Sequence, residues 1–394
     1  MSASLEVQIF CDMDAREVED LETDVLRVIT RLNIGGPARQ ALLLTRELSS
    51  EHPTVLAAGH APPEEGELDD PSVPVVRVPL VRAPRPLKDI AALRAVRSLI
   101  QDLHPRIVHT HMAKAGAVGR LAARRFGDVR TVHTFHGHVL EGYFSSPVER
   151  AFIRAERFLA ARTDALIAVS DEIRDVLLDM RVGRPEQFHV IPLGFELDVF
   201  LSVEGKTGDF RSEIGLDLDT PLVAVIGRVT AIKDHETLLH AVARLPGTHL
   251  AVLGDGDRRT EAEDIARALH IADRTHFLGW RHDLTKVLAD VDVVALTSRN
   301  EGTPVSLIEA AAARRPVVAT AVGGTAAVVR NGVTGLLVQA REAEDVAAAL
   351  GRLLGDPSLA ERFGRAGRDH VRERFSHHRL LRDIADLYED LMTR

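Results

Sequence analysis

The sequence of 394 residues contains one cysteine, Cys11, and few aromatic side chains. A single cysteine excludes a disulfide framework and a thiolate zinc site built within one chain. Aromatic residues make up 4% of the chain, which argues against a base-stacking platform for nucleic acid. The 49 basic and 58 acidic side chains give a net charge of −9, so a general nucleic-acid-binding protein is disfavoured as well.

Long apolar runs are also missing from the chain. No stretch approaches the roughly 18 apolar residues of a membrane span, and the first residues lack the basic start and apolar centre of a secretory signal. We therefore expect a cytoplasmic protein, with peripheral contact at the inner face of a membrane left open. Residues 1–23 are acidic and predict a poorly ordered extension, with an added edge strand at Val7–Phe10 as the alternative.

From Val25 onward, short β-branched runs alternate with longer segments rich in alanine and leucine. The length predicts two or three domains, and strand–helix alternation predicts right-handed βαβ units in doubly wound parallel sheets. The expected strands are 25–30, 54–57, 75–78, 107–110, 130–134, 165–169, 189–191, 222–226, 249–253, 275–278, 291–296, 316–319 and 335–338. The expected helices are 37–48, 87–102, 115–125, 147–161, 171–179, 235–243, 258–269, 283–288, 304–313, 342–354 and 380–392.

The alternation stops over Leu193–Asp219, which is rich in Gly, Asp and Glu, and then restarts. We expect two doubly wound α/β domains of Rossmann type that face each other across a cleft, because such sheets bind ligands at the carboxyl ends of their strands. The expected segments are an acidic extension (1–23), a first domain (24–195), a linker (196–219), a second domain (220–375) and a C-terminal helix that packs back on the first domain (376–394).

Glycine follows the first strand of each expected domain. Gly35 and Gly36 precede Pro37 at the start of a helix, where free amides and the helix dipole favour a phosphate. The spacing is neither Gly-x-Gly-x-x-Gly nor a Walker sequence, and a plain strand–helix turn is the alternative. In the second domain, Gly227 is followed by Arg228 and, five residues later, by Lys233. A guanidinium and an ammonium there suit a pyrophosphate, with two ordinary surface cations as the alternative.

Two glutamates flank another expected helix start. Glu301 and Glu309 are eight residues apart, and Pro304 suits the first helical turn, which leaves the amides of residues 302–306 free for hydroxyls or phosphate. The two carboxylates could therefore bind two different parts of one elongated polyhydroxylated ligand. The alternative is a pair of solvated glutamates.

Histidines gather in the first domain. Residues 131–138 read Thr-Val-His-Thr-Phe-His-Gly-His, and His109 and His111 lie at the end of the preceding expected strand. A metal site is one interpretation, but the carboxylate partners of a catalytic metal are not nearby in sequence. We favour a single functional residue, His136, with the other histidines structural, and we expect no metal.

These segments resemble the retaining glycosyltransferase family 4 (group 1), which has the GT-B fold. Residues 301–309 resemble its Glu-x7-Glu motif, and the surrounding stretches VIGRVTAIKDHETLLHA, LGDGD, FLGW, PVVATAVGGT and NGVTGLLV are similar to its second domain. NIGGPARQ, THMAKAG, TFHGH and VIPLGFELDVF resemble its first domain and linker. The similarity extends in order over about residues 25–375.

The resemblance implies roles for single residues. His136 and Glu301 would be catalytic, with His136 beside the reacting end of the donor sugar and Lys114 contacting a phosphate on the acceptor. The implied donor-binding residues are Gly35 and Gly36 for the phosphates, Arg228 and Lys233 for the diphosphate, Gly302, Thr303, Pro304 and Val305 with Glu301 for the sugar, and Glu309 for the ribose. One departure is Arg314, which stands where the family's helix usually ends with glycine.

The resemblance also implies an activity. A hexosyl or N-acetylhexosaminyl group would pass with retention from a nucleotide-sugar, UDP by family frequency, to an acceptor hydroxyl in cell-surface polysaccharide or glycolipid assembly. No cofactor and no metal would be needed, because the cations and helix amides stabilise the leaving diphosphate. A nucleotide-sugar 2-epimerase of the same fold, a soluble small-molecule acceptor and a non-catalytic sugar-binding protein remain alternatives.

Basic side chains are concentrated in two helical segments of the first domain. One interpretation is contact with an anionic lipid surface, with aromatic side chains inserted. The other is a core helix that buries Phe152, Ile153, Phe158 and Leu159 and leaves its arginines in solvent. The basic residues are Lys114, Arg120, Arg124 and Arg125 in the first segment and Arg150, Arg154, Arg157 and Arg162 in the second.

Overall fold

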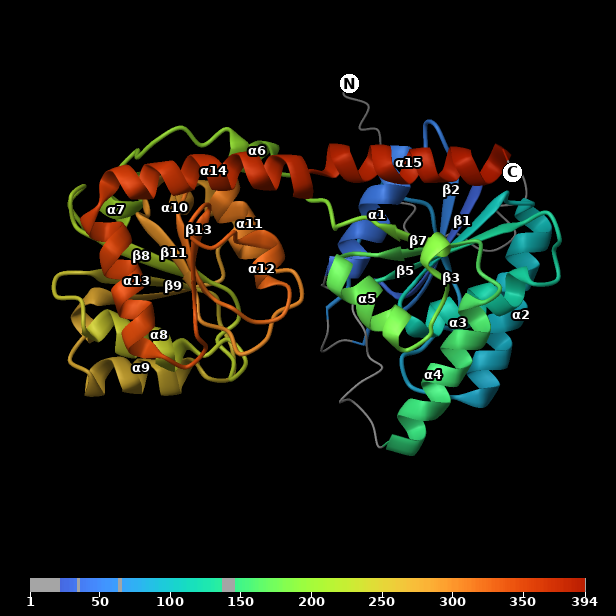
Figure 1. The fold of residues 1–394 in the computed structure, drawn as a ribbon, viewed down its shortest axis with the longest axis horizontal. Coiled ribbons are helices and arrows are strands. Elements are labelled where there is room, and N and C mark those ends of the chain that lie inside the picture. The colour runs from blue at the N-terminus through green and yellow to red at the C-terminus, as the bar shows by residue number, and fades with distance from the viewer. Residues whose placement is uncertain (1–21, 34–35, 63–65, 137–145, 394) are drawn as a thin grey trace, which may run out of the picture. The chain divides into compact units, whose positions relative to one another are not determined.

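The computed structural model describes residues 22–33, 36–62, 66–136 and 146–393. Most of the expected acidic extension, the alternative strand Val7–Phe10 and Gly35 lie outside these ranges. The chain forms two compact units, one of Met1–Gly194 with His378–Arg394 and one of Phe195–His377 (Figure 1). None of the described helices is long and apolar enough to cross a bilayer.

The first unit is a seven-stranded parallel sheet in the order β3-β2-β1-β4-β5-β6-β7, with helices packed on it (Figure 1). Apart from the edge strand β7, its strands are almost wholly buried, as expected for parallel strands that are covered on both faces. The strands are β1 (Val25–Arg31), β2 (Thr54–Gly59), β3 (Val75–Arg77), β4 (Ile107–His111), β5 (Arg130–Phe135), β6 (Ala165–Ala168) and β7 (Phe188–Val190). The helices are α1 (Gly36–Leu48), α2 (Pro86–Leu103), α3 (Ala113–Ala123), α4 (Ser146–Ala160), α5 (Asp171–Asp179) and α15 (His377–Thr393).

The C-terminal helix α15 belongs to the core of this unit. Its residues Leu380, Ile384 and Tyr388 are buried in one cluster with Val25 and Leu44. Tyr388 also binds the fully buried guanidinium of Arg27, whose Nη2 donates to the tyrosine hydroxyl over 2.9 Å. The last helix is therefore fastened to the first strand of the sheet by both apolar and polar contacts.

The second unit is a six-stranded parallel sheet in the order β10-β9-β8-β11-β12-β13. Two buried clusters, one for each face, form its core. The strands are β8 (Leu222–Ile226), β9 (His249–Leu253), β10 (Thr275–Gly279), β11 (Val293–Leu296), β12 (Val317–Thr320) and β13 (Gly335–Val338). The helices are α6 (Asp198–Leu201), α7 (Asp209–Glu213), α8 (His235–Ala243), α9 (Arg259–Ala268), α10 (Leu284–Asp290), α11 (Val305–Ala312), α12 (Thr325–Val328), α13 (Ala343–Gly355) and α14 (Pro357–Phe375).

Residues 196–219, which we expected to be a linker, are packed into the second unit. Leu197, Val203 and Phe210 are buried in its core. The carboxylate of Asp290 accepts the backbone amides of Gly208 and Phe210, each over 2.8 Å. Scattered apolar residues and one buried carboxylate thus anchor a segment that has no apolar run.

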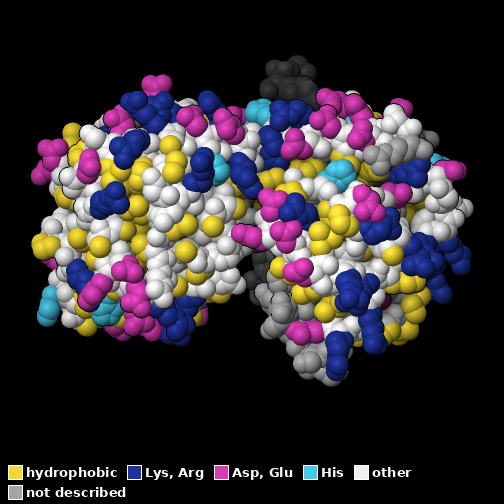
Figure 2. Space-filling view, in the orientation of Figure 1, with side chains coloured by type: hydrophobic (Ala, Val, Ile, Leu, Met, Phe, Trp, Pro, Cys, Tyr) yellow, Lys and Arg dark blue, Asp and Glu magenta, His cyan; other side chains and the backbone are white. Residues whose placement is uncertain are grey.

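The two basic helical segments differ from the core-helix interpretation of the sequence, and one of their basic residues is removed from the surface. Arg120 is buried, and its Nη1 lies 2.7 Å from the Oε1 of Glu156 in α4, so it does not face solvent. Leu159 is buried, whereas Phe152 and Phe158 are 40% and 42% exposed, so a helix that buries all four apolar residues is wrong. Figure 2 shows Lys and Arg side chains with hydrophobic atoms between them at the lower end of the first unit, where Figure 1 places α4.

Candidate functional site

In each sheet the strand order reverses once, between β1 and β4 in the first unit and between β8 and β11 in the second. The chain adds strands toward one edge of the sheet before this point and toward the other edge after it. The loops that follow the two central strands therefore lead to opposite sides and leave a space between them. The resulting crevice at the carboxyl ends of the strands is the usual ligand site of a doubly wound sheet. The candidate residues of the sequence follow these four strands, except His136, which follows β5.

The best-defined contact lies at the reversal point of the second sheet. Lys233 follows β8 and Glu301 follows β11, and Nζ of the lysine lies 2.5 Å from Oε1 of the glutamate. Ser298 donates its hydroxyl to the same oxygen over 2.5 Å. The side chains of Lys233 and Glu301 are 20% and 10% exposed, so their charges are only partly solvated. The structure thus brings together one residue that we expected to bind the diphosphate and one that we expected to bind the sugar.

Arg228 lies on the same loop as Lys233. It follows Gly227, whose φ of 153° favours glycine, and its side chain is exposed. Among the described residues it forms no ion pair. Its guanidinium is therefore available to an anionic ligand, while the ammonium of Lys233 keeps two of its three N–H donors beyond the one that meets Glu301.

Helix α11 begins directly after Glu301. Pro304 is its N-cap, with φ −75° and ψ 91°, and not a residue of the first turn as we expected. No side chain caps this end, so the first amides of the helix, at Val305 and Ser306, point outward with the positive end of the dipole. Glu309 lies one turn further along and is half-buried. The arrangement provides backbone donors between the two glutamates.

Two glycines that we did not select from the sequence support the loop of Glu301. The amide of Gly324 donates to the carbonyl oxygen of Glu301 over 3.0 Å. A methyl group on Gly323 would collide with that oxygen, and one on Gly324 would collide with the carbonyl oxygen of Gly302. The sequence signal that could have identified this support is the pair of glycines soon after the buried strand β12, because glycine permits another backbone to approach closely.

At the reversal point of the first sheet, Gly36 opens α1 after β1, and Lys114 lies in the first turn of α3 after β4. Lys114 Nζ contacts both carboxylate oxygens of Asp89, each at 2.8 Å. This lysine therefore carries a carboxylate partner, and its expected contact with an acceptor phosphate stays a prediction.

His136 is positioned by a chain of buried histidines. Its Nε2 lies 2.9 Å from Nδ1 of His111, whose ring stacks on His109 at 4.4 Å between centroids. His109 is held by the hydroxyls of Tyr388, at 2.5 Å, and Thr134, at 2.8 Å. Burial lowers the pKa of His136 to about 3. The ring is therefore neutral at physiological pH and can donate from one nitrogen and accept at the other.

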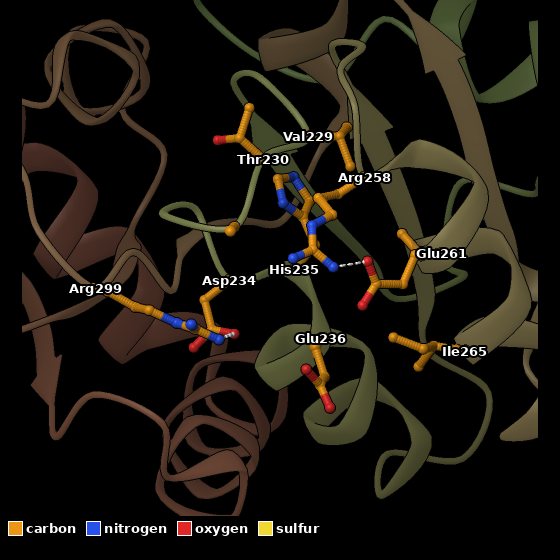
Figure 3. Close-up of a pocket in the computed structure, with 11 residues that line it drawn as sticks. Val229, Thr230, Asp234, His235, Glu236, Arg258, Glu261, Ile265 and Arg299 are labelled. Carbon is orange, nitrogen blue, oxygen red and sulfur yellow. Dashed lines mark hydrogen bonds and ion pairs between the residues drawn. The ribbon is translucent and has the colours of Figure 1, made fainter.

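A pocket of about 140 Å³ is lined in part by Val229, Thr230 and Asp234 of the segment after β8 (Figure 3). Its polar walls include two ion pairs, one between Arg258 and Glu261 and one between Arg299 and Asp234. None of the site residues expected from the sequence lines it. The pocket is therefore distinct from the contact between Lys233 and Glu301, although it shares the loop after β8 with that contact.

The doubly wound sheets with polar side chains at their reversal points define a two-domain α/β protein of Rossmann type. Residues 207–370 match the model of glycosyl transferases group 1, and residues 35–194 match that of the glycosyl transferase 4-like domain. The chain belongs to the group 1 family of glycosyltransferases and has the GT-B fold. The resemblance seen in the sequence is confirmed.

Among the relatives, the D-inositol 3-phosphate glycosyltransferase of Mycobacteroides abscessus is 34% identical over 67% of this chain and 61% of its own length. The protein of the same name from Actinosynnema mirum is 35% identical over 68% of this chain and 69% of its own length. The UDP-Gal:alpha-D-GlcNAc-diphosphoundecaprenol alpha-1,3-galactosyltransferase of Escherichia coli is 28% identical over 78% of this chain and 81% of its own length.

Solved structures share the fold at lower identity. A glycosyltransferase from Rickettsia africae superposes with a TM-score of 0.79 and 17% identity over 94% of this chain and 99% of that one. HepE from Anabaena in complex with UDP gives a TM-score of 0.78 and 21% identity over 93% of this chain and 100% of that one.

Proposed function

We propose that this chain is a retaining glycosyltransferase that moves a hexosyl or N-acetylhexosaminyl group from a UDP-sugar to a phosphate-bearing acceptor. The observation that carries the proposal is the contact between Lys233 and Glu301 at the reversal point of the second sheet. Arg228 lies on the same loop as Lys233, and the uncapped start of α11 lies between Glu301 and Glu309 in the chain. Such a set can bind a diphosphate through the cations and helix amides and sugar hydroxyls through the carboxylates.

The roles follow from charge. Arg228 and Lys233 neutralise the diphosphate as it leaves, with the first amides of α11 beside them. Glu301 accepts from hydroxyls of the donor sugar, Glu309 binds the ribose, and neutral His136 contacts the sugar near its reacting carbon. The acceptor oxygen forms a bond to that carbon on the face from which the diphosphate oxygen departs. The departing phosphate oxygen takes the acceptor proton, so no metal and no separate base is required.

Two comparisons support the choice of substrates. HepE has been crystallised with UDP and with UDP-glucose, which favours uridine as the base of the donor. The names of the relatives from Mycobacteroides and Escherichia coli specify acceptors that carry a phosphate or a diphosphate. Lys114 is the cation proposed for that phosphate, which would share or replace its contact with Asp89. A place in cell-surface polysaccharide or glycolipid assembly follows from such acceptors.

The test is a panel of UDP-, GDP- and ADP-sugars offered with inositol phosphate and with polyprenyl-diphosphate sugars. We expect transfer from a UDP-sugar, and NMR of the first-formed product should show the anomeric configuration of the donor. Inverted product would contradict retention. Donor incubated alone distinguishes the 2-epimerase alternative, which would yield an epimeric nucleotide-sugar. Transfer only to acceptors without phosphate would overturn the acceptor proposal and favour a soluble small molecule.

A further inference from the structure

Asp234, the residue after Lys233, has a strained backbone. Its φ of 51° and ψ of 50° lie in the left-handed region, which residues with a Cβ atom adopt rarely. The residue stands at the N-cap of α8, a position where aspartate usually accepts a helix amide, yet its side chain makes no such bond. Helix capping by the side chain therefore does not account for aspartate at this position.

The carboxylate of Asp234 instead binds two other side chains. Oδ1 accepts from Nη2 of Arg299 over 3.0 Å (Figure 3). Oδ2 accepts from the hydroxyl of Thr237 over 2.9 Å. Only 2% of the Asp234 side chain is exposed, whereas 38% of the Arg299 side chain is. A buried carboxylate with both oxygens occupied holds the strained backbone in one conformation.

Arg299 comes from the other loop of the reversal point. It lies two residues before Glu301, and its backbone amide donates to the carbonyl oxygen of Ile232 over 2.8 Å. Thr297, on the same segment, donates its hydroxyl to the carbonyl oxygen of Asp234 over 2.9 Å. The loops after β8 and β11 are thus joined next to the contact between Lys233 and Glu301.

We propose that Asp234 and Arg299 are positioning residues, whose ion pair holds Lys233 and Glu301 at the spacing that nucleotide-sugar binding requires. That the pair positions Lys233 and Glu301 does not depend on the proposed function. That this spacing serves nucleotide-sugar binding rests on the proposed function. The pair touches neither reacting group directly and acts through the loop that each shares with a site residue. Without the pair, the loop after β8 would sample other conformations, and Lys233 would leave Glu301 for solvent.

The decisive variant is Asp234→Gly, because glycine relieves the backbone strain while it removes the carboxylate. A purely structural role predicts an equally stable or more stable protein with unchanged affinity for ligand. Arg299→Gln removes the other partner, and Asp234→Asn, which tolerates the left-handed region, should give an intermediate result. His270→Gly is the matched control, since His270 has φ 55° and is exposed after α9.

The first measurement needs no nucleotide. The chain has five lysines, so acetic anhydride labelling followed by mass spectrometry reads Lys233 separately, with Lys206 and Lys286 as internal references. We expect Lys233 to be labelled at least threefold faster in Asp234→Gly and in Arg299→Gln than in the wild type. Unchanged labelling would overturn the positioning of Lys233 by this pair, whatever the protein binds.

The second measurement is UDP affinity by calorimetry, with the split between KM and kcat for the donor. We expect at least a fivefold weaker Kd in each single variant, no further loss in the double variant, and wild-type affinity in His270→Gly. Faster labelling with unchanged UDP affinity and kinetics would show that the pair orders the loop without serving the site, which contradicts the proposal. Failure of the wild type to bind UDP, GDP or ADP would contradict the proposed function instead, while the labelling result still decides whether the pair positions Lys233.

Discussion

Lys233 and Glu301 are 68 residues apart in the chain, yet Nζ and Oε1 lie 2.5 Å from each other. Each residue stands just after a central strand of the second sheet, and the parallel arrangement of β8 and β11 places both loops at one edge. The attraction between opposite charges stabilises this contact. A cation and a carboxylate are therefore in place at the reversal point before any ligand binds.

Substitutions at this contact should separate binding from turnover. We expect Lys233→Ala and Glu309→Ala each to weaken UDP binding about tenfold or more, because they remove contacts to the nucleotide half of the donor. Glu301→Ala should mainly lower kcat, because the sugar contacts strengthen in the transition state. Calorimetry and donor kinetics check this, with Lys286→Ala as the control, since the partly exposed Lys286 pairs with Glu213 and not with a site residue. Unchanged UDP affinity in both of the first two variants would contradict the assignment.

Metal removal should leave the activity intact. Arg228, Lys233 and the amides of α11 supply positive charge to the leaving diphosphate, and the ring nitrogens of His109 are both engaged by hydroxyls. We expect equal rates before and after dialysis against EDTA. Loss of activity that Mg²⁺ or Mn²⁺ restores would show a metal requirement. It would favour the interpretation of the histidines in the first unit as a metal site.

The buried histidines should make stability fall in acid. Burial lowers the pKa of His136 to about 3, and burial is the largest cause of the strong lowering at His109, His111 and His133. Unfolded histidine binds a proton near pH 6.5, so between about pH 6.5 and 3 the unfolded chain holds more protons. The free energy of unfolding therefore rises with pH in this window and is lost on acidification.

Each buried histidine contributes up to about 1.4 kcal/mol per pH unit to that slope. His136→Gln should therefore give a shallower dependence, and the exposed His282→Gln should keep the slope of the wild type. Urea unfolding at several pH values between 5.0 and 7.5 measures both. An unchanged slope in His136→Gln would mean that this ring binds protons equally in the folded and the unfolded chain, which contradicts a lowered pKa.

Arg314 should be a site where a glycine stabilises the fold. Helix α11 ends at Ala312, and Arg314 takes a left-handed φ of 59° while its amide donates to Ala311. The side chain is exposed and repels the positive charge of Arg368. We expect Arg314→Gly to raise the free energy of unfolding by about 1 kcal/mol, because glycine adopts this conformation without steric cost. Urea unfolding checks the change, and a destabilised variant would contradict it.

The strands were the most predictable part of the fold. Leu222–Ile226, His249–Leu253 and Gly335–Val338 coincide with β8, β9 and β13, because short apolar runs between polar turns have few other buried arrangements. The long helix α14 was not predicted. Its interior glycines, Gly364 among them, reduce helix propensity but let it lie against the backbone of Arg314.

The candidate site was only partly predictable. Motif residues such as Lys233 and Glu301 stand out by type and position, but their contact depends on the order of the strands. Ser298 and Arg299 carry no local signal, since their partners lie at Glu301 and Asp234 in the folded chain. The strained backbone of Asp234 is likewise invisible in a sequence, because aspartate is common just before helices for the unrelated reason of capping.

The surface of α4 suits an anionic membrane better than the sequence alone indicated. Phe158 is 42% exposed, and its ring lies against the guanidinium groups of Arg124 and Arg162, at 5.1 and 4.1 Å from the ring centre. Arg154 and Arg157 are exposed on the same helix. Aromatic rings among cations are typical of interfacial helices, and each cation near an anionic surface contributes about 1 kcal/mol.

We therefore expect the protein to bind vesicles that contain phosphatidylglycerol at low salt and to leave them as salt rises, because screening weakens surface attraction. Arg150→Glu with Arg154→Glu should lower the bound fraction at least fivefold in sedimentation. The control is Arg365→Glu with Arg372→Glu, an equal charge change at two exposed arginines of α14 in the other unit. An equal loss in both double variants would mean that net charge, and not α4, controls binding. Equal and negligible binding of the wild type to neutral and anionic vesicles would contradict membrane contact and favour a soluble acceptor.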